Sequence, residues 1–230
     1  MKKYLSFLIV LVLSFTSCKK EDLAETEDNG QDSTSITEVD TVEKSENNYH
    51  LIKISTIKGE IYLWLFDQTP IHKERFEWMT INGHFDNQTF NRVINNFVIQ
   101  GGTDLDTLNL DTVLTPSPYE KLEGLVHQFG ALGAARTGDD VNPNREDKGD
   151  QWYLVEEMNS ATAARLDTGY VIFGQVVSDL EVLRQLARVQ TNFSDEPLEP
   201  LIMQADTVTV KESFLRDSLN FNLESLMLAP

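Results

Sequence analysis

Between residues 49 and 210 the chain is dominated by short runs rich in β-branched and aromatic residues, separated by glycine, proline and polar residues. Such runs are typical of strands. Strands are expected at residues 50–57, 60–66, 89–94, 97–100, 127–135, 151–155, 170–177 and 201–210. The pattern of a helix appears at residues 67–83 and 178–189. Because strands and helices do not alternate as β-α-β units, the pattern favours a closed or nearly closed antiparallel barrel with helices over its ends.

The two expected helices have different signals. In residues 67–83, Pro70 suits the first helical turn. Its inward face is expected to carry four apolar residues, Ile71, Phe76, Met79 and Ile81. Residues 178–189 begin with a capping-box pair, Ser178 and Glu181, in which each side chain can satisfy a backbone N–H of the first turn.

The first residues have the pattern of a secretory signal. After the basic start, residues 4–15 are almost all apolar, and this run is shorter than the roughly 20 residues that a membrane-spanning helix needs. Cys18 directly follows the small pair Thr16-Ser17, which resembles the lipobox of bacterial lipoproteins, where the cysteine becomes the lipidated first residue. We therefore expect a cleaved signal at residues 1–17 and a lipid anchor on Cys18. The alternative is an ordinary signal with an incidental cysteine.

Residues 18–48 are expected to form a flexible acidic tether. They contain ten acidic and three basic side chains and no aromatic residue, so they cannot bury enough apolar area to fold. The whole chain has a formal net charge of −18, which repels phosphate backbones and argues against nucleic acid as a partner. The single cysteine excludes an intramolecular disulfide and a cysteine-based zinc cage.

Most motifs for enzyme chemistry are missing from the sequence. The four histidines include no pair at i, i+4 spacing, so we expect surface or hydrogen-bonded structural histidines, no metal and no cofactor. Glu156 and Glu157 are neighbours in an extended segment and point to opposite faces, which favours a solvated charge pair over acid–base chemistry. The sequence also contains neither a serine nucleophile elbow nor a phosphate-binding loop.

One remaining run contains an unusual arginine. It reads Phe90-Asn91-Arg92-Val93-Ile94-Asn95-Asn96-Phe97-Val98-Ile99-Gln100-Gly101-Gly102. Strand periodicity places Arg92 on one face with Phe90 and Ile94, and a snorkelling arginine at a strand edge explains this as well as a functional one does. The run resembles the cyclophilin signature, Phe-His-Arg-(Val/Ile)-Ile-x-x-Phe-Met-x-Gln-Gly-Gly, and shares eight of its fixed residues.

Three further segments resemble cyclophilin landmarks in the same order along the chain. They are Gly130–Thr137, Gln151–Tyr153 and Leu166–Gly174, and the whole resemblance covers roughly residues 50–210. It implies a peptidyl-prolyl cis/trans isomerase, usually monomeric, on a closed eight-stranded antiparallel barrel capped by two α-helices. It also implies proline-containing polypeptides as substrates and a reaction without a nucleophile or a metal.

The resemblance also implies roles for individual residues. Arg92 would hydrogen-bond the imide nitrogen of the substrate proline, and Gln100 would bind the substrate backbone and help to orient the arginine. The residues implied in substrate binding are Phe97, Val98, Ala135, Arg136, Gln151, Tyr153, Leu166 and Tyr170. Asn91 and Val98 stand where the signature has His and Met, and Tyr153 adds a hydroxyl at the pocket, which bears on substrate preference more than on catalysis.

These observations divide the chain into a signal, a lipidated tether, an isomerase domain and a tail, at residues 1–17, 18–48, 49–212 and 213–230. The tail has Leu and Phe at partly helical spacing, which leaves open whether it packs or frays. The leading hypothesis is a prolyl isomerase outside the cytoplasm, anchored to the bacterial envelope, with the outer membrane expected and its face open. The alternatives are a non-catalytic proline-peptide binding module or chaperone on the same fold, and a purely structural surface lipoprotein.

Overall fold

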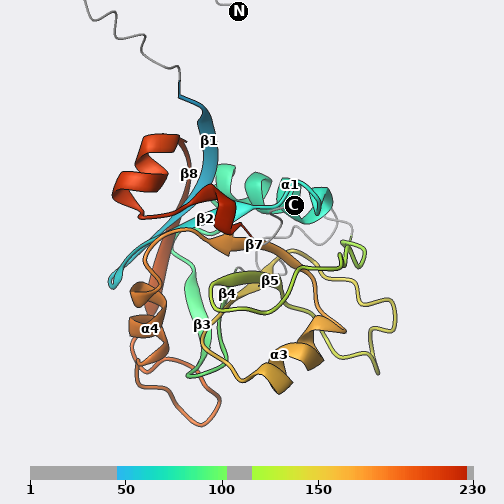
Figure 1. Ribbon diagram of the computed structural model, residues 1–230. Helices are drawn as coiled ribbons and strands as arrows, with labels where there is room; N and C mark the ends of the chain where they lie inside the picture. The colour runs from blue at the N-terminus through green and yellow to red at the C-terminus, as the bar shows by residue number, and fades with distance from the viewer. Residues whose placement is uncertain (1–45, 103–115, 227–230) are drawn as a thin grey trace, which may run out of the picture. The chain divides into compact units, whose positions relative to one another are not determined.

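The described part of the chain is dominated by a closed antiparallel barrel. The computed structural model describes residues 46–102 and 116–226, so the predicted signal, Cys18 and the tether up to residue 45 lie outside the described residues. Eight strands close in the order β1-β2-β7-β5-β6-β4-β3-β8 (Figure 1), and every neighbouring pair is antiparallel. The strands are β1 (Asn48–Thr56), β2 (Gly59–Leu65), β3 (Thr89–Ile94), β4 (Val98–Gly102), β5 (Ala131–Ala134), β6 (Gln151–Val155), β7 (Ile172–Val176) and β8 (Leu201–Lys211). This confirms the predicted fold class.

Strand β5 is much shorter than the predicted 127–135. Gly130 takes a φ of 85°, a left-handed conformation that interrupts an extended strand. The next N–H, that of Ala131, donates back to the carbonyl of Gln128, so the chain turns at this point. The strand therefore begins only at Ala131.

Helices α1 (Pro70–Ile81) and α4 (Glu181–Ala187) lie on opposite sides of the barrel (Figure 1). Helix α1 packs against β7 and β8, and α4 packs against β2, β3 and β4. Phe76 and Met79 of α1 are buried as predicted, but Ile71 and Ile81 are 41% and 70% exposed. The buried stripe instead runs through His72, Phe76 and Thr80, which are four residues apart and so share one face of the helix. Ile71 and Ile81 each lie one residue beyond the ends of that series and therefore face solvent.

The predicted capping box of α4 is wrong. The Ser178 hydroxyl accepts a hydrogen bond from the Tyr62 N–H at 3.0 Å and so joins the helix entry to β2. Asp179 supplies the local cap instead, because its carboxylate accepts from the Glu181 N–H at 2.9 Å. The helix therefore starts at Glu181, three residues later than predicted, and ends at Ala187.

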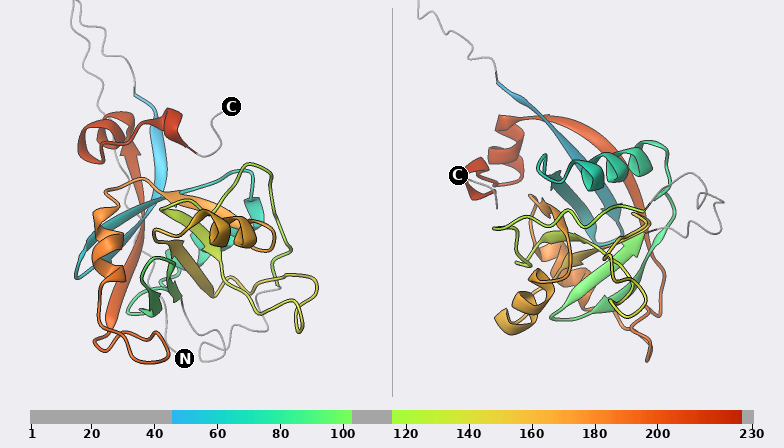
Figure 2. Two further views of the ribbon diagram at one scale, coloured as in Figure 1. Left: turned by 60° about the horizontal axis from the view of Figure 1, so that its bottom comes forward. Right: turned by 90° about the vertical axis from the view of Figure 1, so that its right-hand side faces the viewer.

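The described residues also contain a helix that the sequence pattern does not predict, α3 (Ser160–Asp167). Its N-cap is Asn159, whose side chain accepts a hydrogen bond from the Thr162 N–H at 2.9 Å. It has no buried residue, so the apolar stripe that reveals most helices is missing from its sequence. It connects β6 to β7 on the outside of the barrel (Figure 2).

The described part of the tail packs against the domain. It contains a π-helical turn, η1 (Phe214–Ser218), and a 3₁₀ turn, η2 (Leu223–Ser225). Leu215 is 1% exposed and forms an apolar cluster with Leu51 and Val177 outside the barrel interior. In the right-hand view of Figure 2 these turns lie beside β1 and β8. Among the described helices, none is both long and apolar enough to cross a membrane.

Candidate active site

A β-bulge determines where Arg92 points. The pairing of β3 with β4 shifts register between Phe90 and Arg92, so Asn91 is an extra residue in β3. Phe90 and Val93 are buried, whereas the Arg92 side chain is 42% exposed. The prediction that Arg92 shares a face with Phe90 is therefore wrong, because a bulge breaks the two-residue alternation of a strand and re-aims the side chains that follow.

The predicted site residues come together at one pocket on the outside of the barrel. The pocket has a volume of about 130 Å³ and is lined by Arg92, Phe97, Val98, Gln100, Ala135, Arg136, Tyr153, Leu166 and Tyr170. All of the predicted catalytic and substrate-binding residues are in this lining except Gln151. The lining comes from β3, the turn between β3 and β4, β4, β6 and α3, and from the segments that follow β5 and α3. Residues far apart in the sequence thus form an apolar hollow with a guanidinium at its edge.

Gln151 lies beside the pocket in a chain of side-chain amides. Its Oε1 accepts from Asn91 Nδ2 at 2.9 Å and from Gln100 Nε2 at 3.2 Å. The amide of Gln100 is therefore directed to Gln151, and among the described residues Arg92 pairs with a different group. Asp195 Oδ2 lies 3.6 Å from Arg92 Nη2, with both side chains 42% exposed. No hydrogen bond joins Gln100 to Arg92, so the structure does not support the prediction that Gln100 orients the arginine.

The hydroxyl of Tyr153 is directed to His127, which is itself held by a carboxylate. Tyr153 is 5% exposed, and its hydroxyl lies 2.7 Å from Nε2 of His127. Nδ1 of His127 lies 2.6 Å from Asp167 Oδ1. Burial lowers the pKa of His127 despite the opposing effect of Asp167, and burial raises the pKa of Tyr153. A neutral imidazole that donates from Nδ1 to Asp167 and accepts at Nε2 from the phenol satisfies both contacts.

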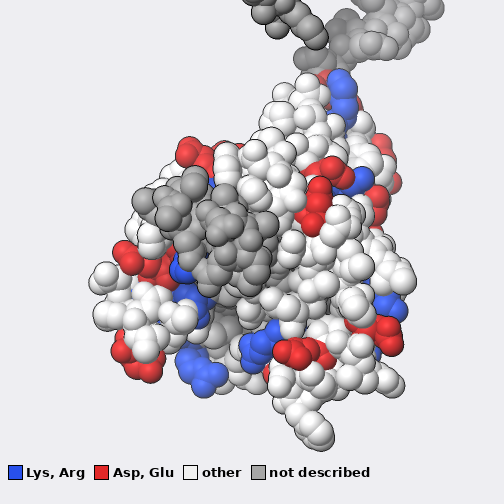
Figure 3. Space-filling model, turned by 180° about the vertical axis from the view of Figure 1, so that it is seen from behind, with Lys and Arg blue, Asp and Glu red and all other residues white. Residues whose placement is uncertain are grey.

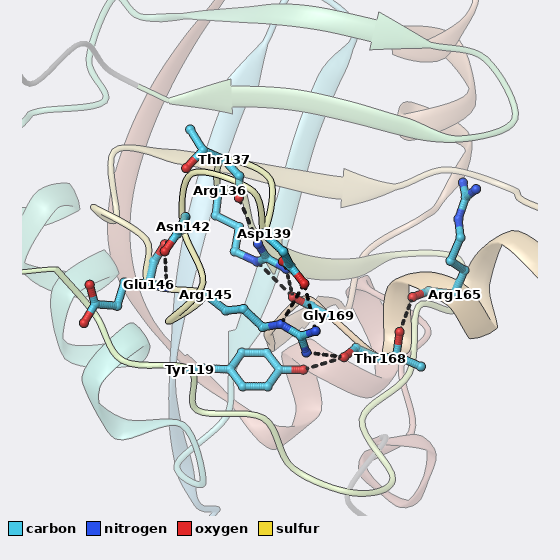
Figure 4. Close-up of polar contacts among 10 residues, drawn as sticks. All are labelled: Tyr119, Arg136, Thr137, Asp139, Asn142, Arg145, Glu146, Arg165, Thr168 and Gly169. Carbon is cyan, nitrogen blue, oxygen red and sulfur yellow. Dashed lines mark hydrogen bonds and ion pairs between the residues drawn. The ribbon is translucent and has the colours of Figure 1, made fainter.

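Arg136 stiffens the pocket wall with its side chain. The guanidinium is 5% exposed and lies 4.6 Å from the centre of the Tyr170 ring. Its Nε and Nη2 donate to the Gly169 carbonyl, Nη1 donates to the Thr137 carbonyl, and Nη2 pairs with Asp139 at 2.8 Å (Figure 4). These contacts use the donors of the guanidinium inside the protein. Arg136 therefore fixes the position of Tyr170 and leaves its own backbone as the part that can meet a substrate.

The loop after Arg136 is held by a second arginine. Arg145 pairs with Asp139 at 2.9 Å and donates to the Thr168 carbonyl at 2.8 Å, and Tyr119 donates to the same carbonyl at 3.1 Å (Figure 4). The hydrogen bonds from Arg136 and Arg145 lower the pKa of the Asp139 carboxyl, so Asp139 stays charged between them. The two arginines therefore connect this loop to the turn that precedes β7.

Two buried polar residues lie outside the pocket: Glu156, which differs from the sequence expectation, and His72, which is a hydrogen-bonded structural histidine as expected. Glu156 is 3% exposed and its carboxylate accepts from the Asn96 N–H at 2.5 Å, so the predicted solvated charge pair is wrong for this residue. His72 is 4% exposed, with Nδ1 at 2.5 Å from Glu120 and Nε2 at 2.8 Å from Asp147. Among the described residues, no cluster of His, Cys, Asp and Glu could hold a metal ion.

The charges on the face seen in Figure 3 are mixed. Most of the basic side chains visible in that view lie next to acidic ones. A surface of this kind lacks the continuous positive potential that nucleic-acid binding requires.

The closed antiparallel barrel, with an apolar pocket and an arginine at its edge, is the arrangement that the resemblance to prolyl isomerases implied. Residues 51–208 match the family described as cyclophilin type peptidyl-prolyl cis-trans isomerase. The chain belongs to this family and is a peptidyl-prolyl cis-trans isomerase of the cyclophilin type, as the resemblance had implied.

Curated relatives occur in distant organisms. The chain is 31% identical over 144 residues to a peptidyl-prolyl cis-trans isomerase of Acinetobacter baylyi, a match that covers 62% of this chain and 74% of the relative. It is 30% identical to the isomerase ppi1 of Schizosaccharomyces pombe, over 65% of this chain and 93% of that protein. The match therefore spans nearly the whole length of the Schizosaccharomyces pombe protein.

Solved structures share the fold. A cyclophilin type isomerase of Cryptosporidium parvum superposes with a TM-score of 0.59 and 26% identity, over 70% of this chain and 98% of that one. A second structure of that isomerase, in the presence of the dipeptide Ala-Pro, gives a TM-score of 0.58 and 24% identity over 69% of this chain and 97% of that one.

Proposed function

We propose that Arg92 drives the isomerisation by stabilising the twisted X–Pro amide. Amide resonance sets a barrier of about 18–20 kcal/mol and makes the uncatalysed rotation take tens to hundreds of seconds. Rotation becomes easier when the nitrogen lone pair no longer conjugates with the carbonyl. A guanidinium that donates a hydrogen bond to the pyramidal nitrogen stabilises that arrangement, and it is charged at any physiological pH.

The arrangement of Arg92 at the rim of the apolar pocket carries this proposal. Val98 and Tyr153 are buried, at 4% and 5% exposure, so the pocket floor offers apolar area to a proline ring. Arg92 lines the same pocket and keeps part of its side chain in solvent. A proline ring in the pocket would thus place its imide nitrogen near a charged donor without burying that charge in the empty enzyme.

The pocket also supports proline-containing polypeptides as the substrate class. The lining residues from β3, β4 and β6 form an open hollow on the outside of the barrel, which an extended chain can cross. Ala-Pro, the dipeptide present in one Cryptosporidium parvum structure, is the smallest unit that contains the bond to be rotated. We assign unfolded or partly folded proteins as clients because their X–Pro bonds are accessible.

A coupled-protease assay with a capped Xaa-Pro peptide tests catalysis against mere binding. The expected result is a cis-to-trans rate that rises in proportion to the concentration of the protein. Saturable binding of the peptide, seen as a fluorescence or NMR titration, without any acceleration would support the non-catalytic module instead.

We also propose that Cys18 carries a lipid that holds the enzyme to the bacterial envelope. The support is the sequence pattern of an apolar run, two small residues and the cysteine, followed by an acidic tether. The full chain expressed in a bacterium should incorporate an alkyne-palmitate label, and Cys18→Ser should abolish it. Label that persists in Cys18→Ser, or its absence from the full chain, would contradict the anchor, and protease treatment of intact cells then reports the membrane face.

A further inference from the structure

The loop between α4 and β8 reaches the edge of the active site. Thr191 and Pro197 form a β-bridge, and Asn192 accepts hydrogen bonds through Oδ1 from Ser194 N–H at 2.8 Å and Glu196 N–H at 3.1 Å. The loop is thus closed by its own hydrogen bonds. In Figure 1 it is the segment below α4 that leads back to β8.

This loop is attached to β3 directly beside Arg92. The N–H of Val93, the residue after Arg92, donates to the Asp195 carbonyl at 2.8 Å. Asp195 N–H donates to the Asn192 carbonyl at 3.1 Å, and the φ of Asp195 is 64°. Asp and Asn are among the few residues other than glycine that adopt this left-handed conformation readily. The backbone of Asp195 is therefore fixed on both sides relative to the arginine.

From this geometry we propose that Asp195 is a positioning residue for Arg92, a role that rests on the proposed function. Its carboxylate is the charged group that Arg92 meets among the described residues, at 3.6 Å from Nη2. The distance is too long for a hydrogen bond, so the attraction restrains the flexible side chain without using its donors. No hydrogen bond joins Nε or Nη1 to a described residue, so these groups can donate to a substrate in the adjoining pocket.

A simple surface ion pair is the competing explanation, and it differs in what it predicts. Pairs this exposed contribute little to stability, so removing the carboxylate should leave folding nearly unchanged under either explanation. Under the positioning role it should lower the rate of rotation, because Arg92 would sample orientations that do not face the pocket. Under the surface role the rate should not change.

The test compares Asp195→Asn with Glu196→Gln. Asn keeps the left-handed backbone and removes the charge, and Glu196 is a neighbouring carboxylate that pairs with Asn192 rather than Arg92. With a neutral capped peptide at low salt, Asp195→Asn is expected to lower kcat about two- to fivefold at unchanged KM, the range that a weak exposed pair allows. Glu196→Gln is expected to match the wild type.

Salt dependence and hydrogen exchange separate positioning from loop damage. The ratio of wild-type to Asp195→Asn activity should fall towards one as salt rises to about 1 M, because salt screens exposed charges. Protection of the Val93 amide from exchange should stay the same in both proteins, since the backbone carbonyl of residue 195 remains.

Three outcomes would overturn the inference. They are Asp195→Asn activity equal to or above the wild type at low salt, a loss that does not depend on salt, and a loss accompanied by exposure of the Val93 amide. Arg92→Ala distinguishes this failure from failure of the proposed function. If Arg92→Ala is inactive while Asp195→Asn is fully active, only the role of Asp195 is rejected, whereas an active Arg92→Ala rejects the proposed function itself.

Discussion

The Tyr153→Phe substitution should reduce stability and leave catalysis intact. The phenol hydroxyl is directed to His127 Nε2 at 2.7 Å, and His127 is not one of the residues that line the pocket. Its removal leaves a buried imidazole nitrogen without its donor, and an unsatisfied buried group of this kind costs about 1–3 kcal/mol. A central loss of about 2 kcal/mol corresponds to a fall in Tm of about 4–8 °C for a domain of this size.

Urea unfolding followed by tryptophan fluorescence measures the stability term, and the coupled-protease assay measures kcat/KM on the same samples. We expect a lower unfolding midpoint at unchanged slope and a kcat/KM within about twofold of the wild type. A double-mutant cycle with His127→Leu isolates the contribution of the Tyr153–His127 hydrogen bond. The sum of the two single losses in unfolding free energy should exceed the loss in the double variant by about 1 kcal/mol. Unchanged stability, or a tenfold change in kcat/KM, would refute the assignment of the hydroxyl to His127.

Three further changes test other parts of the structure. Gly133→Ala would place a Cβ too close to Cζ of Tyr153, so the ring must shift. The substitution should cost about 1–3 kcal/mol and weaken proline-peptide binding in an NMR titration, whereas unaltered affinity would show that the ring does not lie at the binding site. His72 has a raised pKa because its hydrogen bonds and charge interactions with Asp147 and Glu120 outweigh burial. Its stabilisation is therefore full below about pH 6.5, the ordinary pKa of histidine, and is lost as pH rises through the higher folded-state pKa. The advantage of the wild type over His72→Gln in urea should therefore shrink as pH rises above about 6.5, and an advantage that grows with pH would contradict the direction of the shift. Leu215→Ala should destabilise the domain by about 2–5 kcal/mol, and no loss would show that the tail does not contribute to the fold.

The barrel could be predicted because each of its strands is marked by a short local run of β-branched and aromatic residues. β6 (Gln151–Val155) has the predicted bounds, and β1 and β2 form a hairpin close to the predicted strands at residues 50–57 and 60–66. The misses come from interactions that span the fold. The Ser178 hydroxyl accepts a hydrogen bond from the N–H of Tyr62, more than a hundred residues away in the chain. The buried His72 is hydrogen-bonded by carboxylates from two distant loops. Local patterns contain no information about such partners.

The candidate site was predictable to a similar degree, for a different reason. The signature run and the later landmarks carry the pocket residues in order, and the structure brings nine of them together. The bulge at Asn91 has no signal in two-residue alternation, which is why Arg92 was assigned to the wrong face. Asp195 lies about a hundred residues beyond Arg92 in a short polar turn, and His127 looked like any structural histidine. Asp195 and His127 come to lie beside the pocket because the barrel closes.

The central claim is that the charge of Arg92, held at the pocket, lowers the barrier to rotation. NMR exchange spectroscopy on a capped prolyl peptide, with wild type, Arg92→Ala and Arg92→Lys, tests it directly because it measures binding and interconversion in one sample. Arg92→Ala is expected to bind the peptide still but to exchange its cis and trans forms about 10²–10³-fold more slowly, as for loss of a transition-state donor. It predicts an intermediate rate for Arg92→Lys, which keeps the charge but not the planar donor group. Exchange at the wild-type rate by Arg92→Ala, with the fold intact, would contradict the account.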